Sequence, residues 1–246
     1  MKIGFIGTGN MGGALARAAA KGGHTLLLAN RTPAKAAALA KELGGTVCPN
    51  AEAAETAELL FLGVKPQGLP GLAEELAPVL QARKGNAPVV VSMATAVTLR
   101  ELDAMLGGGL PLIRIMPNTP AAVGAGTILY AAQNVTDAQL SAFRAVLAQA
   151  GLLLSLPEAQ IDAASAISGC GPAFCFQFAD ALALGGVRAG LSYPDACRLA
   201  AQTMLGAAEM LLQGGEAPDV LKMRVCSPAG TTIEGVLALE QGGFSY

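Results

Sequence analysis

The sequence has one histidine, no tryptophan and no cysteines spaced as C-x-x-C among its 246 residues. With His24 alone, most histidine-based metal sites are excluded, and so is any Ser-His-Asp triad that does not use this residue. Its place at the start of an apolar run favours a structural role over a catalytic one. Five irregularly spaced cysteines are typical of a reduced, cytoplasmic protein, so we expect no metal site.

Charge is scarce as well, with 14% charged residues, a net charge of −2 and 52% hydrophobic residues. This balance predicts a large core and argues against a nucleic-acid partner. The chain passes from Met1-Lys2 straight into strand-like residues without the pattern of a signal peptide. Pro117 and Pro120 interrupt the apolar region after Arg114, which argues against a membrane span there. A cytoplasmic location without a membrane partner is expected.

The first half of the chain alternates short apolar runs with helical spacing. Strands are expected at residues 2–6, 24–29, 59–64, 88–93, 112–116, 127–131 and 152–156. Helices are expected near residues 10–22, 33–43, 69–82, 98–106 and 137–150. The strands lack clean alternation, which indicates burial on both faces in a parallel, doubly wound α/β sheet.

From Glu158 onward the strand pattern gives way to helical spacing that is rich in Ala and Gly. Helices are expected at residues 173–187, 194–213 and 228–241. The sequence therefore predicts two domains, an α/β domain over residues 1–155 and an all-α domain over residues 156–246. The small, apolar helices of the second domain need a partner, which predicts a homodimer.

The stretch GTGNMG at residues 7–12 matches G-x-G-x-x-G, follows a predicted strand and opens a predicted helix. In that setting Gly7 permits the tight turn, Gly9 lets backbone amides approach a pyrophosphate, and Gly12 lets the helix lie close to the sheet. The diphosphate would rest on the helix N-terminus, whose free N–H groups favour anions. The pattern predicts a dinucleotide site, with a glycine-rich packing turn as the alternative.

The end of the second predicted strand has no acid that could accept hydrogen bonds from the ribose of NAD. The chain continues there with Asn30, Arg31 and Thr32, and the first acid is Glu42. Arg31 can pair with a 2′-phosphate, to which Asn30 and Thr32 can donate hydrogen bonds. We therefore expect NADPH as the cofactor, with NADH and a merely solvated Arg31 as the alternatives.

Further polar loops follow later strands, at the edge where an open α/β sheet holds ligands. Lys65, followed by Pro66, is expected to face the nicotinamide ribose, or else to be a surface charge. The segment MPNTP at residues 116–120 encloses Asn118 and Thr119 between two prolines. It predicts either ligand-facing side chains or a rigid turn alone.

Five motifs in order resemble pyrroline-5-carboxylate reductases over essentially the whole chain: GTGNMG, VKP (64–66), RIMPNTPAAVG (114–124), ISGCGPAF (167–174) and SPAGTT (227–232). The resemblance implies a Rossmann-type domain followed by an all-α dimerisation domain, in homodimers that can form larger rings. It also implies NAD(P)H-dependent reduction of 1-pyrroline-5-carboxylate to L-proline, the final step of proline biosynthesis. It places cofactor contacts on Ile6, Gly7, Thr8, Gly9, Asn10, Met11, Asn50, Gly63, Val64, Lys65, Pro66, Met93, Ala94 and Thr95. It places substrate contacts on Glu158, Ser227, Thr231 and Thr232.

The chain departs from the family pattern at several positions. Ala94-Thr95-Ala96 stands where the family has Ala-Ala-Gly, which adds bulk near the nicotinamide. SPAGT stands where the family has SPGGT, so a positive φ at Ala229 would be strained. Cys170 replaces a serine, Arg224 replaces a common asparagine, and the family pattern runs on through another helical stretch after LEQGGFSY.

The stretch RVCSPAGTTIEG at residues 224–235 has no histidine and no acid before Glu234. Under the resemblance, this suits a cyclic imine that carries a carboxylate. The imine nitrogen is basic enough to be protonated near neutral pH, so hydride transfer depends chiefly on positioning.

The same stretch offers an anchor for the carboxylate. Gly230 opens the backbone, and the amides of Thr231 and Thr232 lie at a helix start, where an anion is favoured. Ser227 can add a hydroxyl bond. Thr232 is the expected catalytic residue, because its hydroxyl can hold the ring nitrogen. An ordinary capped helix is the alternative.

Two other functions fit parts of the sequence. A β-hydroxyacid dehydrogenase shares the two-domain plan but needs a lysine early in the second half, where Lys222 is the only lysine after Lys84. A catalytically silent NADPH-binding or scaffold protein could keep the fold, and a turnover assay would separate it from an enzyme.

Overall fold

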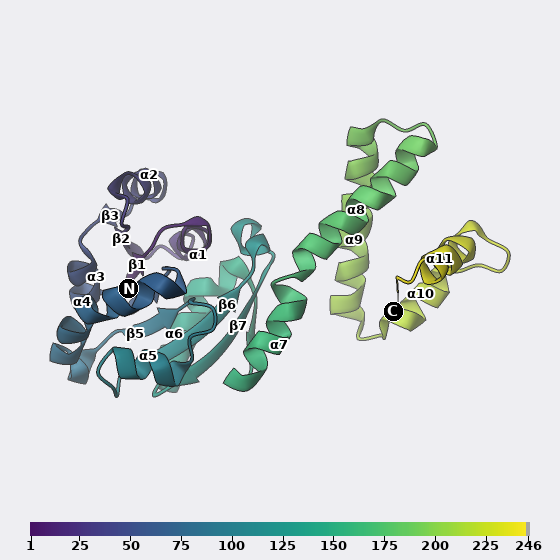
Figure 1. Ribbon diagram of the computed structural model, residues 1–246. Helices are drawn as coiled ribbons and strands as arrows, with labels where there is room; N and C mark the ends of the chain where they lie inside the picture. The colour runs from purple at the N-terminus through teal and green to yellow at the C-terminus, as the bar shows by residue number, and fades with distance from the viewer. Residues whose placement is uncertain (245–246) are drawn as a thin grey trace. The chain divides into compact units, whose positions relative to one another are not determined.

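A computed structural model describes residues 1–244, in two compact units that meet between Ala173 and Phe174. The first holds an eight-stranded sheet in the order β3-β2-β1-β4-β5-β6-β7-β8, and every neighbouring pair is parallel except β6 and β7 (Figure 1). The strands are β1 (Lys2–Ile6), β2 (Thr25–Ala29), β3 (Thr46–Val47), β4 (Leu59–Leu62), β5 (Val89–Ser92), β6 (Leu112–Pro117), β7 (Gly126–Gln133) and β8 (Gly151–Ser155).

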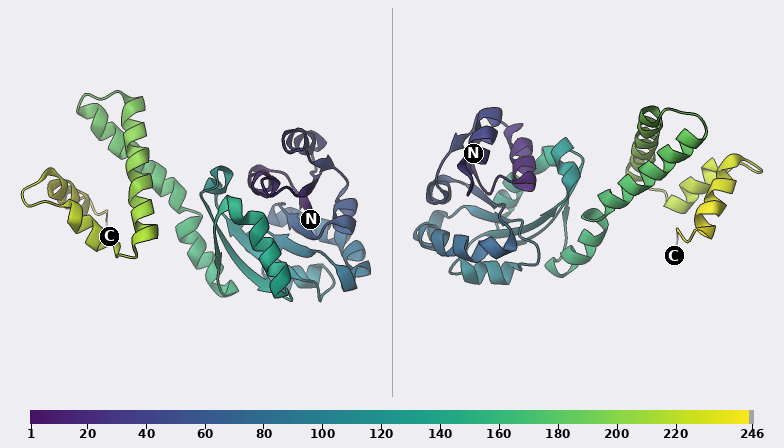
Figure 2. Two further views of the ribbon diagram at one scale, coloured as in Figure 1. Left: turned by 180° about the vertical axis from the view of Figure 1, so that it is seen from behind. Right: turned by 45° about the horizontal axis from the view of Figure 1, so that its top comes forward.

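Helices cover both faces of this sheet (Figure 2). They are α1 (Asn10–Ala20), α2 (Pro33–Leu43), α3 (Asn50–Thr56), α4 (Leu69–Ala82), α5 (Leu99–Met105), α6 (Asp137–Leu147) and α7 (Glu158–Ser168). Short 3-10 turns lie at Pro66–Gly68, Lys84–Asn86, Thr119–Val123 and Ala148–Ala150. The layers follow from the strand sequences, because alternate side chains of a strand enter opposite faces.

Two separate cores result from this alternation. Phe5 and Phe61 stack with ring centroids 4.5 Å apart in the core shared with α1, α2 and α6. Ile6, Leu60 and Leu62 point to the other core, which α3, α4 and α5 cover. The prediction of doubly buried parallel strands is confirmed.

All seven predicted strands and all five predicted helices of the first half are present. The two-residue β3 and the seven-residue α3 were not predicted, because they are too short to show a period. The reversal between β6 and β7 also lay outside the prediction. A short 3-10 turn joins these two antiparallel strands, whereas β7 and β8 are parallel again and are connected through α6.

The second unit is helical throughout its described residues. It comprises most of α8 (Gly171–Arg188), then α9 (Tyr193–Gly214), α10 (Pro218–Val225) and α11 (Thr231–Gln241). The three predicted helices are present, although α11 begins at Thr231 and leaves Pro228 outside. Neither α7 nor α10 was predicted.

This unit has almost no core of its own. Between residues 174 and 244, the buried residues are Ala183, Ala196 and Ala200 alone. Large apolar side chains are exposed instead, such as Phe176 at 70% and Leu212 at 81%. The stretch Glu158–Arg188 is long and apolar enough to cross a membrane by length and composition, since an 18-residue window of it has a mean hydropathy of 1.3. A surface of this kind requires a covering partner.

Candidate active site

The glycine loop joins β1 to α1 through close backbone contacts. Gly7 has φ +97° and packs against Gly63, where an added Cβ would lie 2.6 Å from backbone atoms. A Cβ on Gly12 would collide with the Gly7 carbonyl oxygen, whereas Gly9 has nothing within 4 Å. The loop is therefore closed on the sheet side and open at Gly9.

Two features of this loop fit an anion. Helix α1 begins after Gly9 without a side-chain cap, so its first amides keep their donors for a ligand. The buried Thr8 hydroxyl oxygen has no hydrogen-bond partner within residues 1–244. A buried polar atom of this kind needs an explanation, and a bound phosphate group supplies one.

The predicted cofactor residues of four loops lie at the carboxyl ends of neighbouring strands. Ile6 pairs with Ala29 on one side and with Leu62 on the other, and Leu62 pairs with Ser92. The loops after these strands therefore form one continuous edge. They carry Ile6 to Met11, Asn30 and Arg31, Gly63 to Pro66, and Met93 to Thr95. Asn50 begins α3, next to this edge, and donates to Glu75 at 3.0 Å.

Asn30 and Arg31 have different roles at the end of β2. The Asn30 side chain accepts a hydrogen bond from the Thr8 N–H at 3.1 Å and donates to the Thr32 carbonyl at 3.0 Å. It therefore joins the glycine loop to the start of α2. Arg31, the next residue, is exposed and places a positive charge at the end of β2.

Of the two residues expected on later loops, Lys65 is exposed after β4, whereas Asn118 is buried. Asn118 donates to the Ser168 carbonyl at 2.8 Å and accepts from the Thr127 N–H at 2.8 Å. These bonds favour the rigid-turn interpretation of MPNTP, because the Asn118 amide ties β6 to the end of α7.

The second unit carries Ser227, Gly230, Thr231 and Thr232 together, between α10 and α11. The Gly230 N–H donates to the Ser227 carbonyl at 3.0 Å, with Pro228 and Ala229 between them. Proline at the second position and a positive φ at the third define a type II β-turn. An added Cβ on Gly230 would push the Ser227 hydroxyl out of its present position, so glycine leaves that hydroxyl in place.

Helix α11 begins directly after this turn, with Gly230 as its N-cap and no side-chain cap. Its first amides, from Thr231 onward, are therefore available to an external acceptor. Within the part of the chain that the structure describes, the Thr232 hydroxyl makes no hydrogen bond. It is therefore also available to an external group. The capped-helix alternative for this stretch is thus not supported by a side-chain cap.

Two alanines adopt the left-handed conformation, Ala96 with φ 60° and Ala229 with φ 57°. Both stand where the resemblance puts glycine, one after β5 and one in the turn before α11. The strain expected at Ala229 is therefore confirmed. A Cβ in this region costs roughly 1–2 kcal/mol relative to the right-handed conformation.

We expect Ala229→Gly to raise the free energy of unfolding by roughly 1 kcal/mol, because glycine removes the left-handed strain but adds entropy to the unfolded chain. Urea unfolding of the full chain at one fixed protein concentration measures the change. Ala208→Gly, at an exposed position inside α9, is the matched control and should destabilise by a similar amount. Destabilisation by both substitutions would contradict the strain at Ala229.

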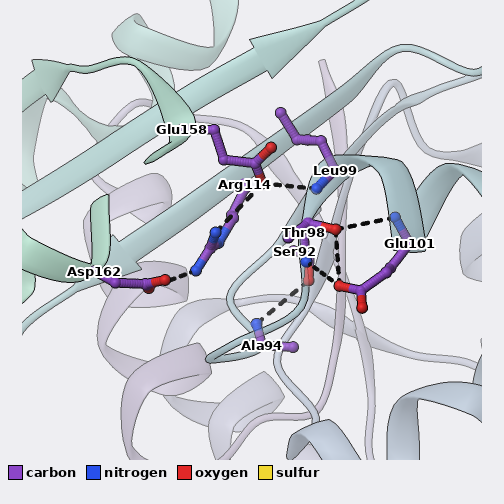
Figure 3. A network of polar contacts seen from close by, with 8 residues as sticks. All are labelled: Ser92, Ala94, Thr98, Leu99, Glu101, Arg114, Glu158 and Asp162. Atoms are coloured by element: carbon purple, nitrogen blue, oxygen red, sulfur yellow. Dashed lines mark hydrogen bonds and ion pairs between the residues drawn. The ribbon is translucent and has the colours of Figure 1, made fainter. Parts of the chain in front are cut away.

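Glu158 lies in the first unit, at the start of α7, apart in sequence from the other predicted substrate residues. Its Oε1 accepts the Leu99 N–H at 2.7 Å and lies 3.3 Å from Arg114 Nη1 (Figure 3). Nearby, Thr98 and Glu101 form a capping box at the start of α5. The Thr98 backbone N–H donates to the Glu101 carboxylate and holds its pKa below the ordinary value.

The sequence interpretation missed Arg114, although a lone arginine inside the apolar run LIRIM is a detectable pattern. A buried cation needs carboxylate partners. Glu158 and Asp162, spaced i, i+4 on one helix face, supply them.

Two family models match the chain. A model described as pyrroline-5-carboxylate reductase dimerisation matches residues 158–246, and one described as NADP oxidoreductase, coenzyme F420-dependent, matches residues 2–96. Pyrroline-5-carboxylate reductase 3 of Danio rerio is 37% identical over 99% of this chain and 85% of its own length. The Pseudomonas aeruginosa pyrroline-5-carboxylate reductase is 38% identical over 99% and 90%. The chain belongs to the pyrroline-5-carboxylate reductase family.

Solved structures agree with this membership. A pyrroline-5-carboxylate reductase from Coxiella burnetii superposes with a TM-score of 0.89 at 32% identity, over 99% of this chain and 91% of that one. The Plasmodium falciparum pyrroline carboxylate reductase with NADP bound gives 0.87 at 28% identity, over 100% and 92%. The 3-hydroxyisobutyrate dehydrogenase of Mycobacterium tuberculosis, at 21% identity and 0.56, shares the fold alone.

Membership of the pyrroline-5-carboxylate reductase family makes this chain a nicotinamide-dependent oxidoreductase that acts on a small molecule and forms homo-oligomers. The two open helix starts have a natural place in such an enzyme. The start of α1 suits the cofactor diphosphate, and the start of α11 suits a carboxylate.

Proposed function

We propose that this protein reduces 1-pyrroline-5-carboxylate to L-proline with a nicotinamide cofactor, as its relatives' names indicate for them. The observation that carries the proposal is the uncapped start of α11 directly after the Ser227–Gly230 turn. That start offers backbone amides to an anion, and the first turn of α11 carries one acid, Glu234, and no histidine. Its test is the consumption of NADPH on addition of pyrroline-5-carboxylate, with L-proline as the product.

The substrate carboxylate binds to the amides of Thr231 and Thr232 and to the Ser227 hydroxyl. Charge-assisted hydrogen bonds from such donors are each worth about 1.5–3 kcal/mol. Glycine at position 230 leaves the Ser227 hydroxyl in its place beside the turn. This arrangement selects an imine that carries a carboxylate.

The reaction needs the imine carbon to face the hydride donor while its nitrogen carries a proton. The bound nicotinamide supplies the hydride. The Thr232 hydroxyl holds the ring nitrogen, and the residue is the proposed catalytic group for that reason. Since the imine arrives protonated, the chain has to orient it and exclude water rather than transfer a proton to it.

The proposed cofactor is NADPH rather than NADH, bound along the edge formed by the loops after β1, β2, β4 and β5. The fit rests on the open amides of α1, on the Thr8 hydroxyl that lacks a partner within residues 1–244, and on the exposed Arg31. No acid follows β2 that could accept a hydrogen bond from the ribose 2′-hydroxyl of NADH, since the next acid in the sequence is Glu42.

We expect Arg31→Ala to raise the KM for NADPH about ten- to a hundredfold and to leave the KM for NADH nearly unchanged. The reason is the loss of one charge-assisted contact to the 2′-phosphate. Steady-state kinetics with both cofactors measures the split. Lys41→Ala, which removes an exposed cation at the far end of α2, should change neither value. An equal effect of Arg31→Ala on both cofactors would overturn the assignment.

The proposed homo-oligomer is a dimer formed by the helices after residue 157, with larger rings of dimers as its further assembly. Its support is the exposed apolar surface of the second unit, which a partner's helices would cover. The apolar stretch Glu158–Arg188 falls within the matched dimerisation region. We propose partner helices as its cover, and a cytoplasmic location stays a prediction.

A further inference from the structure

Arg114 is a cation buried inside the sheet. Its side chain is 3% exposed, and its strand neighbours by register are Ser92 on β5 and Ala131 on β7. Neither neighbour carries a charge. Burying a cation in such surroundings is costly unless carboxylates pair with it, so its partners are constrained in position.

Both partners come from α7. Arg114 Nη2 donates to Asp162 Oδ1 at 2.7 Å, and Nη1 lies 3.3 Å from Glu158 Oε1. The Glu158 side chain is 28% exposed and that of Asp162 66%. Because exposed ion pairs are screened by water, Glu158 is the better shielded partner, whereas Asp162 makes the shorter contact.

Glu158 passes this constraint on to α5. The Leu99 N–H, which donates to Glu158 Oε1, belongs to the first residue of α5 and is buried. Amides of the first helical turn have no acceptor within their own helix, and a carboxylate there also favours the helix dipole. Within residues 1–244, every hydrogen bond to this carboxylate goes to Oε1 (Figure 3).

The segment Met93–Val97, here called the nicotinamide loop, lies directly before this contact. At its first end, the Met93 N–H donates to the Leu62 carbonyl at 3.2 Å and the Ala94 N–H to the Ser92 hydroxyl at 3.3 Å. At its other end, α5 is held by Glu158. The loop is thus attached to the sheet at its first end and to α7 at its other end, and it contains the left-handed Ala96.

We propose that Arg114 and Glu158 are positioning residues for the nicotinamide loop: Arg114 holds the Glu158 carboxylate, which holds the start of α5 and so fixes where the loop ends. The proposal rests on the proposed function, because the loop's role depends on the cofactor site. In this proposal Glu158 positions the loop by accepting the Leu99 N–H, and its role is not limited to a contact with the substrate.

Hydrogen exchange of the full-length protein tests the contact without turnover. Glu158→Ala should speed exchange of the Leu99 amide about ten- to a hundredfold, since one charge-assisted bond is lost. Arg114→Met should also speed exchange of the Leu99 amide. Glu58→Ala is the matched control, because Glu58 also accepts a backbone N–H, from Lys2 at 2.8 Å, at the opposite edge of the sheet. It should leave exchange of Leu99 unchanged.

Kinetics tests the positioning role. Arg114→Met and Glu158→Ala should each lower kcat about tenfold or more, with little change in the KM for NADPH, because the pyrophosphate site is built elsewhere. The double variant should be no slower than Glu158→Ala, since both act on one contact. Glu158→Gln, which keeps an acceptor for Leu99, should recover part of kcat.

The outcomes separate this proposal from its rivals. Unchanged Leu99 exchange in Glu158→Ala, with a loss confined to the KM for pyrroline-5-carboxylate, would overturn it in favour of a direct substrate contact. Additive losses in the double variant would also overturn it. Arg83→Met, which removes a half-buried arginine bonded to the Ala54 and Ala57 carbonyls, controls for general loss of stability. If the wild-type protein showed no turnover at all, the proposed function would fail, while the exchange result would still decide the contact.

Discussion

Replacing Gly12 with alanine should abolish measurable NADPH binding and lower the melting temperature. The added Cβ would collide with the Gly7 carbonyl oxygen, which is backbone and cannot yield cheaply. Helix α1 would have to move away from the loop, and at least two amide–phosphate contacts would be lost. At about 1.5–3 kcal/mol each, their loss weakens binding more than a hundredfold. Fluorescence titration with NADPH and thermal melting measure the two effects.

Gly9→Ala is the matched control for this prediction. Its Cβ would meet nothing within 4 Å, and its φ of −71° suits any residue, so the melting temperature should stay within the error of the wild type. The methyl group would occupy the open side of the loop, and NADPH affinity should fall. Wild-type affinity in Gly9→Ala would show that the diphosphate does not lie on α1.

Thr232→Ala should lower turnover about ten- to a hundredfold. The substitution removes one hydroxyl bond to the charged ring nitrogen, worth about 1.5–3 kcal/mol, and keeps the backbone amides that hold the carboxylate. NADPH affinity should hardly change, because the cofactor edge belongs to the first unit. Steady-state kinetics at saturating NADPH measures the loss.

Thr232→Ser decides whether the hydroxyl is the cause. It should recover much of the turnover, whereas Thr203→Ala, a threonine in α9 bonded to the Leu199 carbonyl, should leave kcat unchanged. A Thr232→Ala protein that turned over at the wild-type rate would reduce Thr232 to a helix residue. Equal activity of the Ser and Ala variants would move the orienting role to another group.

The first unit could be predicted closely because its strands are apolar runs bounded by turn residues. LLFL and VVVS are buried on both faces, and that is a property of the residues themselves. The start of α11 was predicted three residues early because Pro228 is typical of a helix start. The backbone uses it in a turn instead, which the sequence pattern does not distinguish.

The glycine loop was also predictable, because its glycines meet needs that lie within the motif itself: a positive φ at Gly7 and close backbone packing at Gly12. The Arg114 contacts were not, because they join β6 to α7, with partners 44 and 48 positions away. The role of Asn118 was undecided for the same reason, as its acceptor Ser168 lies 50 positions away. Polar contacts of this kind depend on which distant elements pack together, and the pattern of one sequence does not show that.

The central claim is tested most directly by mixing the purified full-length protein with NADPH and 1-pyrroline-5-carboxylate and following both NADPH and proline. The claim predicts NADPH oxidation in step with formation of L-proline, and proline oxidation in the reverse direction at high pH. NADPH that binds to the protein without being consumed in the presence of the imine would contradict it and leave a silent dinucleotide-binding protein.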